Sequence, residues 1–234
     1  MLAQFVLFDG FDPLDVLAPY EVLTAAAMFT RTPLTATLVT AEGPREVTGG
    51  VPGVSLRATA RLDPARADLV VLPGAAGDVR EEEGLTEEER QGTVTARLGR
   101  ALATGLPGLM GEALGREGVT VATVCGGSLI LAMAGLIPGR HVTGHHMGLD
   151  TLSAFGAVAV DARVVDDGDL VSGAGVTSGL DLGLYLVERE FGPHVARDVE
   201  RLFAHERRGV VWRERRPSAP PVRVGRPLIG ERAR

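Results

Sequence analysis

The sequence predicts an α/β protein whose mainly parallel sheet is covered by helices on both sides. Apolar runs long enough for buried strands recur along the chain, without the polar alternation of a half-exposed sheet. Helical patterns separate several of these runs, and glycine-rich turns follow the runs that end near residues 74 and 124. Strands that alternate with helices favour parallel pairing, because each crossover helix lies against the sheet.

The N-terminal half opens with a strand at 3–8 and a helix. Asp12 is the expected N-cap of this helix and Pro13 its first residue. Pro19 falls inside the same helical pattern and should kink or split it. The elements expected next are a strand at 35–41, a hairpin at 45–57, buried strands at 68–74 and 119–124, and a helix at 128–135.

The C-terminal half contains shorter elements. In order, we expect a strand at 141–143, a helix at 147–155, a strand at 157–160 and a hairpin at 163–173 with an Asp-Gly turn. The next helix starts at Ser178, and Asp181 three positions later predicts a capping box. The last helix is amphipathic, with Val195, Val199, Leu202 and Phe203 on one face.

Composition and charge exclude several classes of function. All 24 basic residues are arginine, so lysine Schiff-base chemistry and a phosphate-loop lysine are ruled out. The net charge of −6 argues against nucleic acid as a partner. The single cysteine cannot form an internal disulfide. The chain starts without a basic leader and has no apolar stretch near the roughly 20 residues that span a membrane. We therefore expect a cytoplasmic protein with no membrane partner.

The chain is expected to form one domain over residues 1–212, followed by a tail at 213–234. The tail is rich in proline and arginine, a composition typical of poorly ordered segments. Residues 78–118 form an extended insertion, which starts with an acid-rich stretch and continues into two helical segments. We interpret the insertion as a lid or dimer element, with a plain surface insertion as the alternative.

The lone cysteine, Cys125, stands where a buried strand meets a helix and is followed by Gly126 and Gly127. Ligands of open α/β sheets bind at the carboxyl ends of the strands, so this position suits a nucleophile. Unpaired N–H groups and the positive dipole at a helix start favour the reactive thiolate. Cys125 could instead be a small buried hydrophobic residue. The two glycines favour a nucleophile in a tight, strained turn.

Four stretches resemble the DJ-1/PfpI superfamily and occur in the same order as in that superfamily. They are VLFDGFDPLDVLAPYEVL, VVLPGAAG, TVCGGSLILAMAGLIPGRHVTGHH and RVVDDGDLVSGAGVTSGLDLGLYLVERE, and the match covers roughly residues 3–77 and 119–192. The chain looks most like the branch that contains isocyanide hydratases and the sensor domains of AraC-type regulators. The resemblance implies a flavodoxin-like three-layer sandwich with a nucleophile elbow at Cys125.

The resemblance also implies roles for residues around Cys125. Isocyanide hydratases carry an Asp before an xxGP segment, and Asp15 before VLAP takes that place as the candidate acid/base. Gly74 and Ala75 occupy a Pro-Gly-Gly motif whose backbone N–H groups help to form the oxyanion hole. Gly126 replaces a threonine that commonly follows the cysteine. Asp15 could otherwise be a carboxylate that complements the helix dipole.

Further residues are expected to line the pocket. The first N–H groups of the helix, at Gly126 and Gly127, could hold an anionic intermediate. His145 and His146 stand where the branch often has Thr-His-Trp, and we interpret both as pocket-lining residues and not as members of a triad. Two adjacent histidines lack the spacing of metal ligands, so we expect no metal. We expect no organic cofactor either.

The glycine-rich stretch GAGVTSG at 173–179 is not interpreted as a nucleotide-binding loop. Its glycines are spaced GxGxxxG and follow a hairpin, whereas the dinucleotide fingerprint is GxGxxG after the first strand of a βαβ unit. The resemblance instead implies that this turn, with Gly175 and Thr177, lies beside the active site.

Three functions follow from the resemblance. The first is a cofactor-free enzyme that hydrates isocyanides, in which Cys125 attacks the substrate carbon and Asp15 moves protons, releasing an N-formamide. The second is a sensor module like those of AraC-type regulators, and the third is a glyoxalase, deglycase or stress-protein activity. The resemblance also implies a homodimer that acts on a small molecule.

Overall fold

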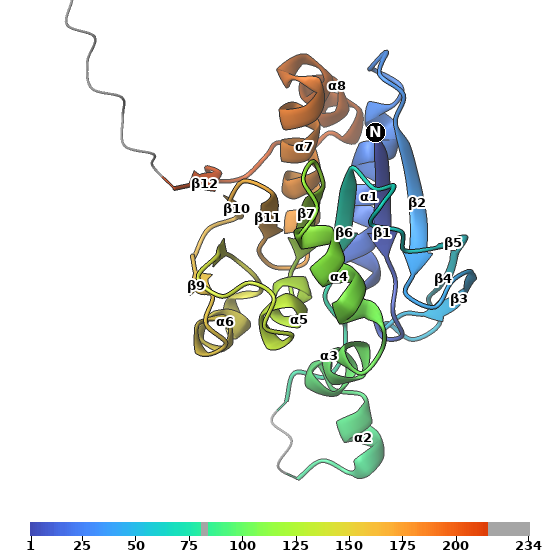
Figure 1. The fold of residues 1–234 in the computed structure, drawn as a ribbon, viewed down its shortest axis with the longest axis vertical. Helices are drawn as coiled ribbons and strands as arrows, with labels where there is room; N and C mark the ends of the chain where they lie inside the picture. Colours follow the sequence, from blue (N-terminus) through green and yellow to red (C-terminus); the bar gives the residue numbers. More distant parts are fainter. Residues whose placement is uncertain (81–83, 215–234) are drawn as a thin grey trace, which may run out of the picture.

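The computed structural model describes residues 1–80 and 84–214, which form a central eight-stranded sheet with helices on both faces (Figure 1). The strands lie in the order β12-β10-β11-β7-β6-β1-β2-β5, and every neighbouring pair is parallel except β10–β11. The prediction of an α/β fold with a mainly parallel sheet is confirmed. The strands are β1 Leu2–Val6, β2 Thr35–Thr40, β5 Ala60–Arg61, β6 Leu69–Leu72, β7 Thr120–Val124, β10 Val164–Asp166, β11 Leu170–Gly173 and β12 Trp212–Arg213.

Two small sheets flank the large one. An antiparallel hairpin joins β3 Arg45–Thr48 to β4 Ser55–Ala58, as predicted for residues 45–57. The other small sheet is a parallel pair of β8 His141–Val142 and β9 Val158–Ala159.

The helices form the two outer layers. Helices α1, α7 and α8 contact one another on one side of the sheet, while α3, α4 and α5 lie on the other (Figure 1). The helices are α1 Pro13–Ala26, α2 Glu87–Gln91, α3 Val94–Leu102, α4 Leu106–Leu114, α5 Gly127–Met133, α6 Leu149–Ala154, α7 Ser178–Phe191 and α8 Pro193–Phe203, with a 3₁₀ turn η1 at His146–Gly148. Among the described residues, no helix has both the length and the apolar character needed to cross a bilayer.

Helix α1 begins as the sequence predicts. The Asp12 side chain accepts a hydrogen bond from the Leu14 N–H at 2.9 Å, and Pro13 is the first helical residue. Pro19 lies inside α1, but the helix continues to Ala26, so the expected split does not occur. Nine of its residues are buried against the sheet and α7, and this burial outweighs the backbone hydrogen bond that proline removes.

The capping box expected at the start of α7 is wrong. Thr177 precedes the helix in a helical conformation, and its side chain makes no capping bond. The Asp181 carboxylate instead accepts hydrogen bonds from Arg163 Nε at 2.7 Å and from the Arg208 N–H at 2.8 Å. The charged guanidinium of Arg163 forms a stronger hydrogen bond than a neutral backbone donor at the helix start would.

The C-terminal end of the described chain adds an unexpected strand. Trp212 and Arg213 form β12, which pairs in parallel with β10, so the sheet extends into the first residue of the expected tail. The remaining tail at 215–234, expected to be poorly ordered, lies outside the described residues.

Candidate active site

Cys125 occupies a strained turn between β7 and α5. Its φ of 55° lies in the left-handed region that residues with side chains rarely adopt. The Cys125 N–H donates to the carbonyls of Gly173 at 3.1 Å and Ala174 at 2.9 Å, which fixes the turn to the end of β11. A Cβ at Gly127 would lie 2.3 Å from the Leu72 carbonyl oxygen, so the turn requires glycine at that position. This geometry is that of a nucleophile elbow.

Asp15 reaches the elbow from α1. Its side chain is fully buried, and Oδ2 accepts a hydrogen bond from the Gly74 N–H at 2.9 Å. Oδ1 is also buried and has no hydrogen-bond partner among the described residues. The carboxyl group interacts with the Cys125 side chain, so the two titratable groups form one site. Glu21, on the same helix, is exposed and takes no part.

Burial controls the titration of this pair. Desolvation, followed by the negative charge of Asp12, raises the pKa of Asp15 well above its ordinary value of 3.8. Desolvation, followed by the charge of Asp15, also raises the pKa of Cys125, although the Gly126 N–H acts in the opposite direction. Burial therefore opposes the effect of the helix start, which was expected to favour the thiolate. Because the charge of Asp15 raises the pKa of Cys125, a protonated Asp15 would be the state that permits a thiolate.

The loop at 73–77 carries a backbone donor beside the elbow. The Gly74 carbonyl accepts from the Asp12 N–H at 2.9 Å, and the Ala76 N–H donates to the Gly10 carbonyl at 3.2 Å. The Ala75 N–H between them has no hydrogen-bond partner among the described residues. Because this free N–H and that of Gly126 both lie close to Cys125, they could stabilise a negative charge on a substrate.

A cavity of about 600 Å³ adjoins Cys125, which is 7% exposed. Its volume falls within the range of small-molecule sites. The walls are mainly apolar, and α3 of the insertion contributes part of them. Among the lining residues are Asp12, Ala75, Leu98, Gly126, Leu129, Met133, His145, Met147, Phe155 and Val176. The insertion therefore contributes directly to the site. The sequence had left its role open between a lid, a dimer element and a surface feature.

A buried network of hydroxyl groups positions the segment that carries His145. Ser128 Oγ lies 2.6 Å from Thr123 Oγ1 and donates to the Thr143 carbonyl at 2.7 Å. Ser172 Oγ accepts from the Thr143 N–H at 2.8 Å. Sequence reasoning missed this network, although a serine and threonines within otherwise apolar strands and helices signal buried hydrogen bonding.

The other expected pocket residues separate into two groups. His145 lines the cavity, and desolvation, followed by His146, lowers its pKa, which favours the neutral ring. His146 is exposed and does not line the cavity.

In the turn after β11, Val176 lines the cavity, while Gly175 lies against the His145 ring. Thr177, contrary to expectation, is exposed, and its hydroxyl accepts a hydrogen bond from Arg163. Gly74 and Gly127 are buried under the cavity, where they contact Asp15 and the Leu72 carbonyl, respectively.

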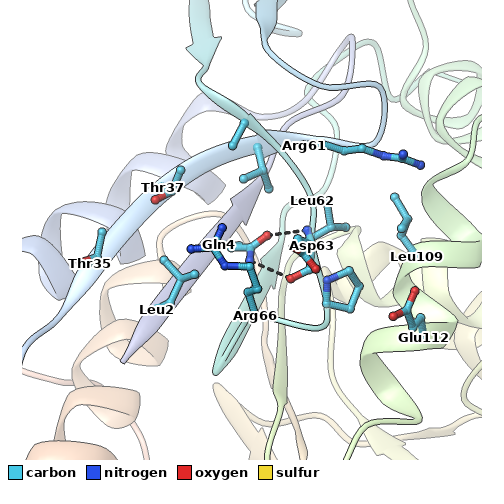
Figure 2. Close-up of a pocket in the computed structure, with 13 residues that line it drawn as sticks. Leu2, Gln4, Thr35, Thr37, Arg61, Leu62, Asp63, Arg66, Leu109 and Glu112 are labelled. Carbon is cyan, nitrogen blue, oxygen red and sulfur yellow. Dashed lines mark hydrogen bonds between the residues drawn. The ribbon is translucent and has the colours of Figure 1, made fainter.

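A second hollow, of about 760 Å³, is lined by residues of β1, β2 and β5 (Figure 2) and shares no lining residue with the cavity at Cys125. Gln4 spans its floor and exchanges two hydrogen bonds with the backbone of Asp63, at 2.9 and 2.8 Å. The lining includes neither cysteine nor histidine. Although this hollow is the larger one, it offers no nucleophile, so the cavity at Cys125 is the candidate active site.

One cluster elsewhere has the residue types of a metal site, although the sequence predicted none. Ligand-type atoms of His141, Asp167 and Glu214 lie within 4.8 Å of one another. Arg140 binds the Asp167 carboxylate at 2.5 Å and already supplies a positive charge there. None of these residues lines the cavity at Cys125, so the cluster is separate from the candidate active site.

Comparison with known proteins places the elbow and its surroundings in a family. The model of the DJ-1/PfpI family matches residues 108–189. An isonitrile hydratase of Pseudomonas putida is 30% identical over 199 residues, which are 84% of this chain and 75% of the hydratase. This chain belongs to the DJ-1/PfpI family.

Two further proteins are similar over different shares of their length. A ThiJ/PfpI family protein from Pseudomonas syringae has a similar structure, with a TM-score of 0.71 and 25% identity over 96% of this chain and 78% of that one. The transcriptional regulator CdhR of Pseudomonas aeruginosa is 35% identical over 92 residues, which are 38% of this chain and 27% of the regulator. The DJ-1/PfpI fold, with its flavodoxin-like arrangement, is therefore found here as the sequence predicted.

Proposed function

We propose that this DJ-1/PfpI protein is a cysteine-dependent enzyme that hydrates an isonitrile to an N-formamide. The proposal depends on one observation: Cys125 adopts a strained elbow beside the buried Asp15 carboxyl group and a cavity of about 600 Å³. The similarity to an isonitrile hydratase over 84% of the chain supports this choice of reaction.

In the first proposed step, the sulfur of Cys125 forms a bond to the isonitrile carbon. The proton of the Cys125 thiol passes through Asp15 to the same carbon, which gives a thioimidate, R–N=CH–S–Cys. The raised pKa of Asp15, due first to burial and then to Asp12, lets the carboxyl group hold a proton at higher pH than an exposed aspartate does, which suits it to deliver that proton. Sulfur and proton add together, so no group leaves in this step.

In the second step, water adds to the thioimidate carbon. One proton of the water reaches the substrate nitrogen, the carbon–sulfur bond breaks, and the other proton returns to the Cys125–Asp15 pair. The free N–H of Ala75 and the N–H of Gly126 would stabilise negative charge on the incoming oxygen. The products are R–NH–CHO and the starting enzyme. Sulfur, carboxyl and water supply every reacting group, so the proposed reaction needs no metal or organic cofactor.

The test is incubation of the purified protein with a small alkyl isonitrile, with the N-formamide followed by NMR. We expect turnover by the wild type and none by Cys125→Ala. Intact-mass analysis of wild type during turnover should show an adduct equal to the full mass of the isonitrile. Full activity in Cys125→Ala would contradict the mechanism, and faster turnover of methylglyoxal than of the isonitrile would favour the glyoxalase alternative.

A second candidate function is ligand sensing, supported by the 35% identity to CdhR over 92 residues. In that case, ligands would bind in the cavity without chemical change. Binding of DNA in a gel-shift assay, lost when residues 213–234 are removed, would support this function, whereas turnover without DNA binding would exclude it. We further propose that the protein is a cytoplasmic homodimer, and light scattering of the purified chain tests the dimer.

A further inference from the structure

Arg97, on α3 of the insertion, runs through a narrow slot between two loops. A Cβ at Gly10 would lie 2.7 Å from Arg97 Cδ, and a Cβ at Gly50 would lie 2.4 Å from Arg97 Nη1. Gly10 belongs to the loop between β1 and α1, and Gly50 to the hairpin of β3 and β4. The arginine side chain therefore occupies space that only glycine leaves open on both sides.

The guanidinium group ends at the loop that carries the candidate oxyanion donor. Arg97 Nη1 donates to the Ala76 carbonyl at 2.5 Å, and the Ala76 N–H donates to the Gly10 carbonyl at 3.2 Å. Both backbone polar groups of Ala76 are thus fixed from outside the loop. Ala75, with its free N–H, is the adjacent residue and lines the cavity.

We propose that Arg97 is a positioning residue. It holds the loop at 74–77 so that the Ala75 N–H stays directed at the oxygen that adds to the reacting carbon. The effect of Arg97 on catalysis rests on the proposed function. Backbone donors accelerate a reaction only when their geometry is set before the charge develops. Arg97 does not line the cavity and acts through Ala76, so it is not a catalytic residue.

Arginine suits this position for two reasons. A charged N–H donor forms a stronger bond to a carbonyl than a neutral one does, and the long side chain passes its aliphatic stem along Gly10 before its guanidinium group reaches Gly50. The half-buried site disfavours the charged form of Arg97. Desolvation first, and then the positive charge of Arg100, lower the pKa of Arg97. At the other end of the same loop, the Gly74 N–H donates to Asp15 Oδ2 at 2.9 Å, so the loop is held on both sides of Ala75.

The test compares Arg97→Gln and Arg97→Lys with a matched control, Arg100→Gln. Arg100 lies on the same helix and bonds to Gln91, away from the loop. With a small alkyl isonitrile, we expect kcat of Arg97→Gln to fall by about tenfold to a hundredfold, with a much smaller change in KM, because a misplaced donor acts on the transition state. Arg97→Lys should lose less, and added guanidinium chloride at millimolar concentration should restore part of kcat in Arg97→Gln.

A second readout does not depend on turnover. Hydrogen exchange of the Ala76 amide, which donates to the Gly10 carbonyl, should be at least about tenfold faster in Arg97→Gln than in wild type or Arg100→Gln. Unchanged exchange there, or a kcat equal to that of Arg100→Gln, would overturn the proposal. If the wild type hydrates no isonitrile, the proposed function fails, while faster exchange in Arg97→Gln would still establish that Arg97 holds this loop.

Discussion

The Asp15 carboxyl group and the Cys125 thiol face each other at the joint between α1 and the β7–α5 turn, where both are buried. Each contributes to the pKa shift of the other, although burial is the largest cause for both. The pair combines a strained nucleophile with a proton carrier.

Alkylation of Cys125 by iodoacetamide should begin at lower pH in Asp15→Asn than in wild type. Burial, followed by the charge of Asp15, raises the pKa of the Cys125 thiol, and the substitution removes the second cause. The measurement is the labelling rate against pH, followed by intact mass. Because the chain has one cysteine, Cys125→Ser should remain unlabelled and serves as the control. Coincident pH profiles of wild type and Asp15→Asn would show that the two groups are not coupled.

Stability should depend on pH through Asp15. Its folded-state pKa is raised above 3.8 by burial first and then by Asp12, so the folded state keeps a proton that the unfolded state has released. Stability therefore falls as pH rises from the unfolded pKa through the folded one. Asp15→Asn should unfold with a free energy about 1 kcal/mol or more above that of wild type near neutral pH. The gain should shrink as pH falls toward 4 in urea titrations, and a gain independent of pH would contradict this account.

The two glycines after Cys125 should tolerate substitution differently. A Cβ at Gly126 has its nearest neighbour at 3.4 Å, whereas a Cβ at Gly127 would meet the Leu72 carbonyl at 2.3 Å. We expect Gly126→Thr to fold with stability within about 1 kcal/mol of wild type, and Gly127→Ala to lose about 1–3 kcal/mol or more through overpacking. Thermal unfolding of both variants decides this, and equal losses would contradict it. The isonitrile assay on Gly126→Thr then measures what the threonine hydroxyl contributes.

Asp181 should be important for stability and not for the chemistry. Its buried carboxylate binds Arg163, His205 and the Arg208 N–H, and it ties α7 to the segment that leads to β12. Removing it leaves Arg163 without its carboxylate partner, while the bond to the Thr177 hydroxyl remains, so Asp181→Ala should cost about 3–5 kcal/mol in urea unfolding. Asp198→Ala, at an exposed position of α8, is the matched control and should change stability by no more than about 0.5 kcal/mol. A similar loss in both variants would argue against a specific role for the Asp181 cluster.

The sequence by itself determined the α/β fold, the family and the location of the elbow. Apolar runs of strand length, Asp12 and Pro13 at a helix start, and the Cys-Gly-Gly turn are local signals, because each depends on the conformation of a few adjacent residues. Asp15 could be singled out only through the motif that resembles the family.

The tertiary structure decided which distant residues meet and how their charges titrate. The interaction of Asp181 with Arg163 displaced an expected cap, and the slot between Gly10 and Gly50 brought Arg97 to Ala76. Burial set the direction of the pKa changes at Cys125 and Asp15, against the local effect of a helix start. Desolvation and contact depend on segments far apart in the chain, so spacing and composition could not reveal them.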